Sequence, residues 1–411
     1  MKYECYRQRR AELVARCGYP VILFAGLEDG RHRFVQDSSF FYYTGTTEPG
    51  MAILLLPGGP SILFLPLFTQ SRAQWMGTDL RPTPAVAAEY GFDECVALGE
   101  PCKGYQIDGF GPFSQWQEVG QRLLVLAEAG NKLGTVRANL ASYRVFAGLS
   151  ALSEAAVDCS VEIAAMRRTK DKDEIAALFK AGDITVTAHE AAVMALKPGE
   201  TEARIRASID YIFAQEGAEP AFPSIVAAGK NATILHYDQL GLNAPLNKGE
   251  LVIVDIGARF DQYCADVTRT YPVGGKFSKR QKEVYEAVLK AQEAAISLAR
   301  PGAFLKNDQE PSKSLYHCVC DVLKTHGLAD YFIHGAGHFL GLDVHDVGEV
   351  SEPLRLGDVI TIEPGVYLPD ERMGIRIEDD FWIVEDGSVC LTDQLPKTAG
   401  DVEQFIADAR R

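Results

Sequence analysis

The sequence predicts a two-domain α+β protein, in which a small α/β amino-terminal domain precedes a larger domain with an internal repeat. The chain has 411 residues, which exceeds one typical domain of about 150 residues. Up to about residue 98, short apolar runs are separated by Gly and Pro, as is typical of strands in a mixed sheet. Beyond residue 160, long amphipathic segments alternate with apolar runs. We therefore expect domains at residues 1–160 and 161–411.

In the first domain, strands are expected where the apolar runs are continuous. These runs are YPVILFAG, FFYYTG, MAILLLPGG and PSILFLPLF, at residues 19–26, 40–45, 51–59 and 60–68. Helices are expected between and after the runs, at residues 83–89 and 115–129. Mixed helices and strands of this kind predict one α/β layer structure.

The second domain is expected to repeat a unit of two helices followed by a sheet. Predicted helices at 170–196 and 201–216 precede strands at 223–228, 251–258 and 263–271. Helices at 279–299 and about 310–325 then precede strands at 331–335, 358–363 and 374–384. Thr169 is the expected cap of the first helix, and Ser278 with Gln281 fits a capping box at the third. The repeat predicts a pseudo-symmetric domain with a site at the junction of its halves.

Composition excludes several classes of function. The net charge is −15 and the sequence has no basic stripe, so phosphates would be repelled and nucleic-acid binding is not expected. No apolar run reaches the ~20 residues that a membrane helix needs. The nine cysteines are scattered and contain no CxxC pair, which favours free thiols in a reducing cytoplasm.

Two carboxylates stand in apolar strands of the first half, in VDIGARFDQYCADVTRTYP. These are Asp255 and Asp266, on either side of a turn. An ionised carboxylate inside an apolar strand is costly unless it is paired, protonated or bound to a metal. Asp266 alone could pair with Arg269, but two such residues in neighbouring strands favour a metal site.

The second half adds further polar groups in three motifs. HGAGHFLGLDVHD contains His334, His338 and His345, TIEPGVY contains Glu363, and GIRIEDDFWIV contains Arg376 and Glu378. Alternation along the last strand places Arg376 and Glu378 on one face. Five candidate metal ligands result: Asp255, Asp266, His338, Glu363 and Glu378.

The charge of this set predicts a dinuclear centre. Four carboxylates and one neutral imidazole carry a formal −4, which two divalent ions neutralise. Oxygen-rich ligation with one histidine suits Mn²⁺ or Fe²⁺ best, accepts Co²⁺ or Zn²⁺, and disfavours a thiolate-type zinc site. Two such ions polarise a carbonyl and activate water, which is the chemistry of a hydrolase.

In this order, the motifs resemble the metallopeptidase family of pita-bread (creatinase/aminopeptidase-like) fold, which includes methionine aminopeptidase, aminopeptidase P and prolidase. The amino-terminal segment RHRFVQDSSFFYYTGTTEPG is similar to the amino-terminal domain of aminopeptidase P. The resemblance therefore covers both domains. It implies that Asp255 binds one ion, that Asp266 and Glu378 bind both, and that His338 and Glu363 complete the second site.

The same resemblance implies roles around the metals. His236, in ILHYD, and His334 would shape the proline side of the cleft, and His345 would stabilise the oxyanion. Glu363 would act as general base and proton shuttle. Arg376 and the substrate-binding Tyr367 would orient Glu378 and the leaving peptide.

The expected activity is a Xaa-Pro aminopeptidase, which releases the first residue from peptides that have proline second. A Xaa-Pro dipeptidase is the alternative within the family, and a non-catalytic binding module is a more distant one. Because all five expected ligands are present, the sequence favours an enzyme. The resemblance also implies a homodimer or homotetramer.

Overall fold

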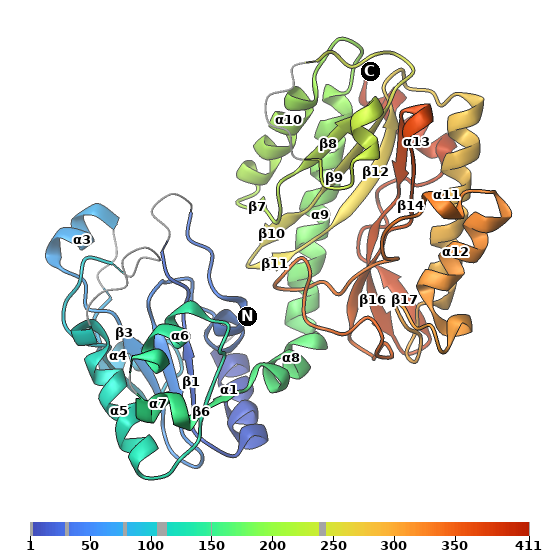
Figure 1. The fold of residues 1–411 in the computed structure, drawn as a ribbon. Helices are drawn as coiled ribbons and strands as arrows, with labels where there is room; N and C mark the ends of the chain where they lie inside the picture. Colours follow the sequence, from blue (N-terminus) through green and yellow to red (C-terminus); the bar gives the residue numbers. More distant parts are fainter. Residues whose placement is uncertain are drawn as a thin grey trace. The chain divides into compact units, whose positions relative to one another are not determined.

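The computed structural model describes residues 3–28, 33–76, 80–104, 113–148, 150–237 and 244–410. The chain divides into two compact units, Met1–Arg167 and Arg168–Arg411, each of which is visible in Figure 1. None of the described helices combines the length and the hydropathy that a membrane-spanning segment requires.

The first unit is built on a mixed six-stranded sheet with the order β4-β3-β2-β1-β5-β6. The two pairings within β3-β2-β1 are antiparallel, whereas β4, β5 and β6 join in parallel. The strands are β1 (Val21–Phe24), β2 (Ala52–Leu55), β3 (Ser61–Leu65), β4 (Glu94–Ala97), β5 (Leu133–Thr135) and β6 (Ala156–Asp158). The predicted strands at 19–26, 51–59 and 60–68 contain β1, β2 and β3 and are confirmed.

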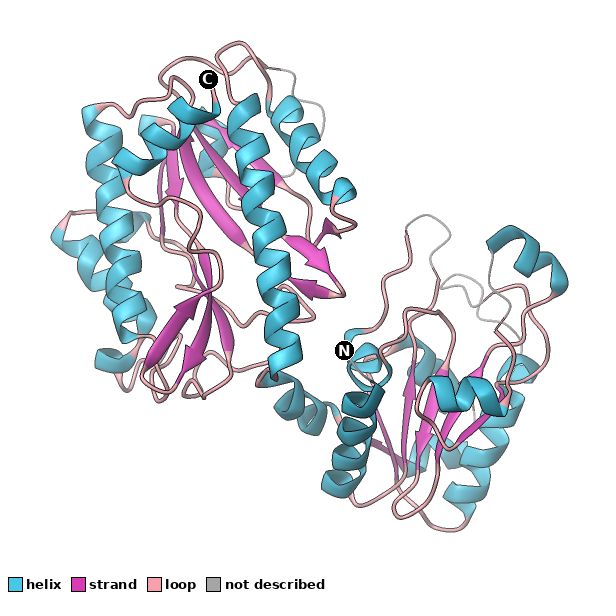
Figure 2. Ribbon diagram, turned by 180° about the vertical axis from the view of Figure 1, so that it is seen from behind, coloured by secondary structure: helices cyan, strands magenta, loops and turns pink. Residues whose placement is uncertain are grey.

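Helices lie on both sides of this sheet (Figure 2). They are α1 (Tyr3–Cys17), α2 (Ser38–Thr44), α3 (Gln70–Met76), α4 (Pro84–Glu89), α5 (Gln117–Glu128), α6 (Leu140–Ala147), α7 (Ser150–Ala155) and α8 (Ser160–Arg168), with the 3₁₀ turn η1 (Phe113–Trp116). Alternate strand residues such as Ile22 and Phe64 pack with Trp116, Leu123 and Phe146 in one buried core. Burial of these apolar side chains is the main term that stabilises the unit.

The predicted strand FFYYTG at 40–45 is wrong, because this segment belongs to helix α2. Asp37 caps the helix by accepting a hydrogen bond from the backbone N–H of Phe40, and Gly45 ends it at φ 67°. The aromatic side chains between these caps are all buried, so no periodicity distinguishes helix from strand. The Asp and Gly caps were the available signal.

The strands of the second unit form several small sheets. They are β7 (Glu219–Pro220), β8 (Ile225–Ala228), β9 (Leu251–Ile256), β10 (Ala258–Phe260), β11 (Tyr263–Cys264), β12 (Val267–Pro272), β13 (Val359–Ile362), β14 (Gly365–Leu368), β15 (Met373–Arg376), β16 (Asp379–Val384) and β17 (Gly387–Cys390). One sheet has the order β12-β9-β8, and another has the order β13-β16-β17. The bridge between Thr268 and Glu378 joins the two halves.

Two pairs of helices flank these strands, with α9 and α10 on one side and α11 and α12 on the other (Figure 1). The helices are α9 (Lys172–Ala195), α10 (Glu202–Gln215), α11 (Lys279–Leu298), α12 (Leu315–Thr325) and α13 (Ala399–Ala409). Ser278 caps α11 with Gln281 in the predicted capping box. The cap of α9 is Asp171 with Glu174, not the predicted Thr169.

One expected strand, at 331–335, is absent. The segment follows the 3₁₀ turn η4 (Ala329–Tyr331) and runs irregularly into the Gly-rich sequence HGAGH. The other 3₁₀ turns of this unit are η2 (Gly229–Thr233), η3 (Pro311–Lys313) and η5 (Pro369–Glu371). Glycines lower the tendency to form a regular strand, and here they leave His334 and His338 on a loop.

Candidate metal and active site

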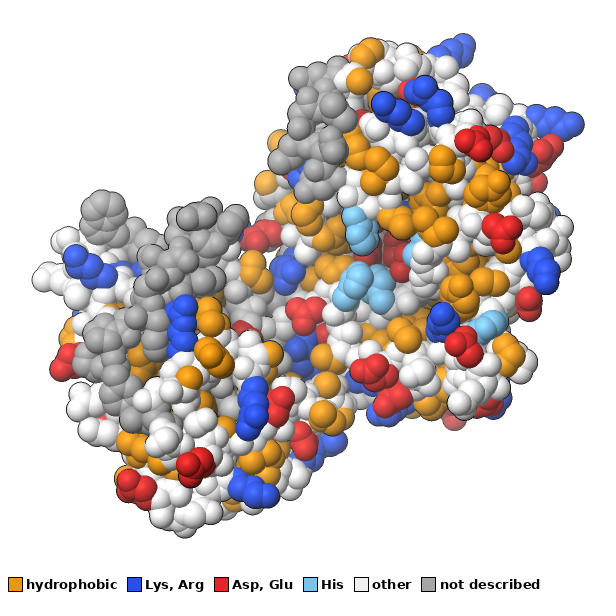
Figure 3. Space-filling model, viewed as in Figure 1, with side chains coloured by type: hydrophobic (Ala, Val, Ile, Leu, Met, Phe, Trp, Pro, Cys, Tyr) orange, Lys and Arg blue, Asp and Glu red, His pale blue; other side chains and the backbone are white. Residues whose placement is uncertain are grey.

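The second unit contains a cavity of about 830 Å³ where its two halves meet. In Figure 3, histidine side chains surround a hollow with acidic side chains inside it and hydrophobic ones at its margin. Nine of the ten predicted site residues line the cavity: His236, Asp255, Asp266, His334, His338, His345, Glu363, Arg376 and Glu378. The tenth, Tyr367, is buried and hydrogen-bonded to two of them.

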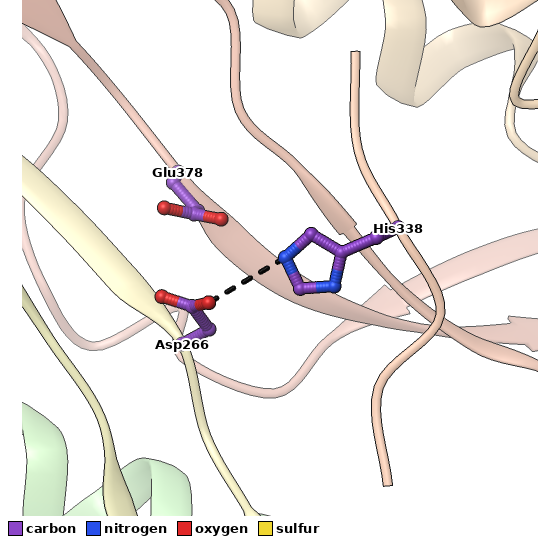
Figure 4. Close-up of side chains that lie close together, drawn as sticks. All are labelled: Asp266, His338 and Glu378. Carbon is purple, nitrogen blue, oxygen red and sulfur yellow. Dashed lines mark ion pairs between the residues drawn. The ribbon is translucent and has the colours of Figure 1, made fainter. Parts of the chain in front are cut away.

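Asp266, His338 and Glu378 approach one another most closely. Each offers one ligand atom, and these atoms lie within 4.8 Å of one another. Figure 4 shows the three side chains turned toward one space, with His338 Nε2 3.5 Å from Asp266 Oδ2. Asp266 precedes β12, and Glu378 stands between β15 and β16. This geometry fits a metal ion.

The carboxyl groups of the cavity repel one another. Burial raises the pKa of Asp266 and that of Glu378 well above their ordinary values, and the neighbouring carboxylates add to each shift. Burial also raises the pKa of Glu363. Asp255 Oδ1 and Asp266 Oδ1 are buried without a hydrogen-bond partner in the described part of the chain. Buried anionic oxygens without partners are costly, and a bound divalent cation would satisfy them.

The pairing of neighbouring strands brings the guanidinium of Arg376 into contact with the carboxylate of Asp255. Thr268 is opposite Asp255 in the β9–β12 register and bridges to Glu378 on its other side. Arg376 Nη2 donates to Asp255 Oδ2 at 2.6 Å, and Arg376 Nη1 donates to Tyr367 Oη at 2.7 Å. The partner of Glu378 is the Thr268 hydroxyl, which donates at 2.7 Å. Arg376 thus contacts Asp255 directly and reaches Glu378 through the Thr268 hydroxyl, to which its Nε donates at 3.1 Å. Tyr367 is hydrogen-bonded to Arg376 and His334, so the expected orientation of Glu378 by these two residues is indirect and stays a prediction.

The alternative in which Asp266 pairs with Arg269 is also excluded by the contacts. The guanidinium of Arg269 is fully buried and donates to Asp379 Oδ1 at 2.7 Å. Asp379 accepts further hydrogen bonds from Gln292 and Thr392. This buried pair supports the strand, and Asp266 remains free to face the cavity.

Hydrogen bonds fix the tautomers of two histidines. His338 Nδ1 is 3.0 Å from the carbonyl oxygen of Phe339, which can only accept, so Nδ1 carries the hydrogen. This leaves His338 Nε2 pointing toward Asp266 and Glu363, where it can bind a metal ion. His334 Nδ1 likewise donates to Gly335 O at 2.8 Å, and its Nε2 accepts from the Tyr367 hydroxyl at 3.0 Å. Burial and Arg376 lower the pKa of His334 to about 4, which keeps it neutral.

His345 contacts His338 but does not belong to the cluster of Asp266, His338 and Glu378. Its ring stacks on His338 with centroids 4.2 Å apart, and burial lowers its pKa. Both His345 and His236 line the cavity. The apolar lining residues are Ala221, Phe222, Pro223, Ile225, Leu235 and Val344.

Several residues that line the cavity, or that bond to its lining as Thr268 does, were not anticipated from the sequence. Thr268 could have been found, because it comes two residues after Asp266, at the strand period, and so faces the same side. Arg259 lines the cavity although it stands in a turn-like segment of the sequence. Residues 221–223 carry no chemical motif, so nothing in the sequence connects them with the site.

Known proteins give an independent comparison. A model of metallopeptidase family M24 matches residues 176–385, and a model of the aminopeptidase P N-terminal domain matches residues 6–101. The structure is similar to that of aminopeptidase P from Escherichia coli with the inhibitor Pro-Leu, with a TM-score of 0.85 and 28% identity. This match covers 100% of this chain and 99% of that one. The predicted fold class is confirmed.

Two sequence relatives differ in how much of the chain they match. The Xaa-Pro aminopeptidase of Haemophilus influenzae is 32% identical across 98% of this chain and 97% of its own length. The Xaa-Pro dipeptidase of Pyrococcus furiosus is 37% identical, but the match covers 55% of this chain and 64% of the dipeptidase. The chain belongs to metallopeptidase family M24 and carries an amino-terminal domain of the aminopeptidase P type.

Proposed function

We propose that this protein is a metallo-aminopeptidase that hydrolyses the bond between the first residue of a peptide and a following proline. The observation that carries the proposal is the cluster of buried carboxylates and one imidazole in a peptide-sized cavity of an M24 chain. Relatives named Xaa-Pro aminopeptidase match nearly the whole chain, which supports this substrate over others. All five candidate ligands line the cavity, and this favours an enzyme over a non-catalytic binding module.

The residues proposed to hold two divalent ions are Asp255, Asp266, His338, Glu363 and Glu378. Two divalent ions would neutralise the formal −4 charge of this set. Asp255 Oδ1 and Asp266 Oδ1, which have no hydrogen-bond partner in the described part of the chain, would be available to bind a cation. Mn²⁺ is the proposed native ion, with Fe²⁺, Co²⁺ and Zn²⁺ as substitutes, because oxygen donors dominate the set. The ions would supply a Lewis acid for the scissile carbonyl and a water acidic enough to attack it.

The chain's own residues would handle protons and position the peptide. Glu363 lines the cavity, with Oε2 3.7 Å from His334 Nδ1, and is the proposed group that takes a proton and passes it to the proline nitrogen. His345 would donate to the developing oxyanion. The lowered pKa of His334 keeps its ring neutral, and the hydrogen bond from Tyr367 fixes the orientation of that ring. Together with His236, it would form the side of the cleft that contacts the proline.

Proline explains why a shaped pocket is needed. The Xaa-Pro bond is a tertiary amide without an N–H, so no backbone donor from proline can be recognised. An apolar wall such as Phe222, Pro223 and Leu235 can recognise the ring by shape instead. The solved E. coli aminopeptidase P binds the inhibitor Pro-Leu, which is consistent with this substrate class.

The distinction from a dipeptidase concerns the group that comes directly after proline. A dipeptidase must recognise a carboxylate there and block longer chains, whereas an aminopeptidase leaves the cleft open. Arg376 is occupied by Asp255 and Tyr367, so it offers no free cation for that carboxylate. Because the Xaa-Pro aminopeptidase relative matches 98% of this chain and the dipeptidase matches 55% of it, we favour the aminopeptidase.

The test is an assay of Xaa-Pro, Xaa-Pro-Yaa and longer peptides, with the released first residue identified by mass spectrometry. We expect the tripeptide to be cleaved with kcat/KM at least equal to that of the dipeptide. Cleavage of the dipeptide alone, with inert tripeptides, would reassign the chain as a dipeptidase. Absence of cleavage at any Xaa-Pro bond would overturn the proposal.

Three further properties belong to the proposal. We place the boundary between the amino-terminal and catalytic domains near residue 160, as the sequence predicts. We also propose a homodimer or homotetramer that works in the cytoplasm. Sedimentation of the purified protein tests the assembly, and a monomer would contradict it.

A further inference from the structure

We infer that Arg259 is a specificity residue that binds a carboxylate group of the peptide substrate. The inference rests on the proposed function, because it concerns which Xaa-Pro peptides that site prefers. It starts from the two guanidinium groups in the lining of the cavity, those of Arg259 and Arg376. Their surroundings differ in a way that leaves one of them available.

The guanidinium of Arg376 is fully engaged within the protein. Its Nη2 donates to Asp255, its Nη1 to Tyr367 and its Nε to Thr268 at 3.1 Å. The side chain is 4% exposed. A substrate carboxylate would have to displace a buried ion pair to reach it, which is costly.

Arg259, in contrast, is half-buried, and its guanidinium makes few hydrogen bonds to the described part of the chain. Within the described part of the chain, its one side-chain hydrogen bond runs from Nη2 to the carbonyl oxygen of Ala221, at 3.3 Å. Glu219 is opposite Arg259 in the β7–β10 register. A guanidinium has five N–H donors, so most of those on Arg259 remain for a ligand.

The backbone holds Arg259 against the apolar wall of the cavity. The N–H of Ala221 donates to Gly257 O at 2.8 Å, and Arg259 returns a bond to Ala221 O. A Cβ at Gly257 would lie 1.8 Å from Ala265 O and 2.9 Å from Phe222, so only glycine permits this approach. The segment 221–223 and strand β10 therefore form one wall that carries the cation.

The distance along the chain fits a short peptide. Asp255 and Arg259 are four residues apart, which spans at most about 14 Å. A tripeptide or tetrapeptide in an extended conformation spans a similar length. A peptide whose scissile bond lies at the carboxylate cluster can thus bring a carboxylate to Arg259. That carboxylate is either the peptide's own carboxyl terminus or an acidic side chain.

The experiment compares matched substrates on the metal-loaded protein. Ala-Pro-Ala is paired with its carboxamide, which tests the terminus. Ala-Pro-Glu amide is paired with Ala-Pro-Gln amide, and Glu-Pro-Ala amide with Gln-Pro-Ala amide, which test side chains. We expect the unmodified protein to favour the carboxylate member of at least one pair by about tenfold in kcat/KM, chiefly through KM.

The variants assign this preference to the side chain. Arg259→Gln should abolish the preference, so that both members of each pair are cleaved with equal kcat/KM, and Arg259→Lys should retain part of it. Arg204→Gln, at an exposed position of α10, is the matched control and should behave as the unmodified protein.

Each outcome is decisive. Equal rates for both members of every pair in the unmodified protein would overturn the inference and leave the proposed function intact, even if a variant failed to fold. A preference that survives Arg259→Gln would also overturn it. Failure to cleave any of these peptides would overturn the proposed function, and the inference with it.

Discussion

Asp266 and Glu378 are the residues whose electrostatics depend most on a bound cation. Both carboxyl groups are buried, and burial with mutual repulsion raises the pKa of each. With raised values, the folded protein binds more protons than the unfolded chain. Stability of the metal-free protein therefore falls as pH rises from about 4, the ordinary carboxyl value, through the raised pKa.

Glu378→Gln removes this titration, and we expect it to abolish turnover. The metal-free variant should gain stability over the unmodified protein as pH rises, and should gain none below about pH 4. Urea unfolding in chelator between pH 4 and pH 8 measures the difference. Glu293→Gln, on the exposed face of α11, is the control and should show no pH-dependent difference. A gain that is the same at every pH would contradict the electrostatic explanation, and near-normal turnover would remove Glu378 from the metal site.

His345→Ala tests the proposed oxyanion donor. Because His345 is outside the closest ligand cluster, we expect metal content to be unchanged while kcat falls by about 10²-fold or more. Metal analysis alongside steady-state kinetics separates the two effects. Loss of a metal ion in this variant would make His345 a ligand instead.

At this scale, the sequence was informative where chemistry and pattern coincide. Asp255 and Asp266 were found because carboxylates are costly in apolar strands. The hydrogen-bond partner of Arg376 could not be found from the sequence. The alternation of side chains along one strand places Arg376 and Glu378 on the same face, but it gives no information about contacts with Asp255 on another strand. Arg259 was missed because its position depends on the close contact of the Gly257 backbone with Ala265 and Phe222, which no sequence motif indicates.

Among the elements, the loop that carries His338 and His345 depends on a buried ion pair. Lys170 Nζ lies 2.9 Å from Asp346 Oδ2, with both side chains 1% exposed. The N–H of Asp346 donates to Phe339 O and closes the loop. The carboxylate next to His345 is thereby anchored to the segment that precedes α9.

Removing one partner should leave the other charge buried and unpaired. We expect Asp346→Asn to cost about 3–5 kcal/mol of stability and to lower kcat, since both histidines share the loop. The double variant Lys170→Met with Asp346→Leu should recover most of the stability. Denaturant unfolding of Asp346→Asn, of the single variants Lys170→Met and Asp346→Leu, and of the double variant measures this. Additive losses in the double variant would show that the two side chains act independently.

The elements also show where local signals suffice. The helix at Ser278 was predicted with its capping box, because both partners lie within four residues. The helix at Ser38–Thr44 was predicted as a strand, because burial on all sides erases periodicity. The segment at 331–335 was predicted as a strand because it is a short apolar run. Such a run does not show that the preceding 3₁₀ turn and the following glycines prevent strand pairing.

At the scale of the whole molecule, every proposed metal residue lies in the second unit, Arg168–Arg411. A ligand that binds only the folded state stabilises the part that holds it, by about 2.7 kcal/mol at a hundred times its Kd. We therefore expect metal removal to lower the unfolding temperature of one calorimetric transition and to leave that of Met1–Arg167 nearly unchanged. Equal shifts of both transitions, or none, would contradict this division.

The most direct test of the central claim is a titration of the metal-free protein with Mn²⁺, combined with measurement of the rate at which the first residue is released from a Xaa-Pro-Yaa peptide. We expect chelation to abolish release, and added Mn²⁺ to restore it with a stoichiometry close to two ions per chain. Undiminished cleavage by the metal-free protein, or failure to bind Mn²⁺ tightly, would contradict the account.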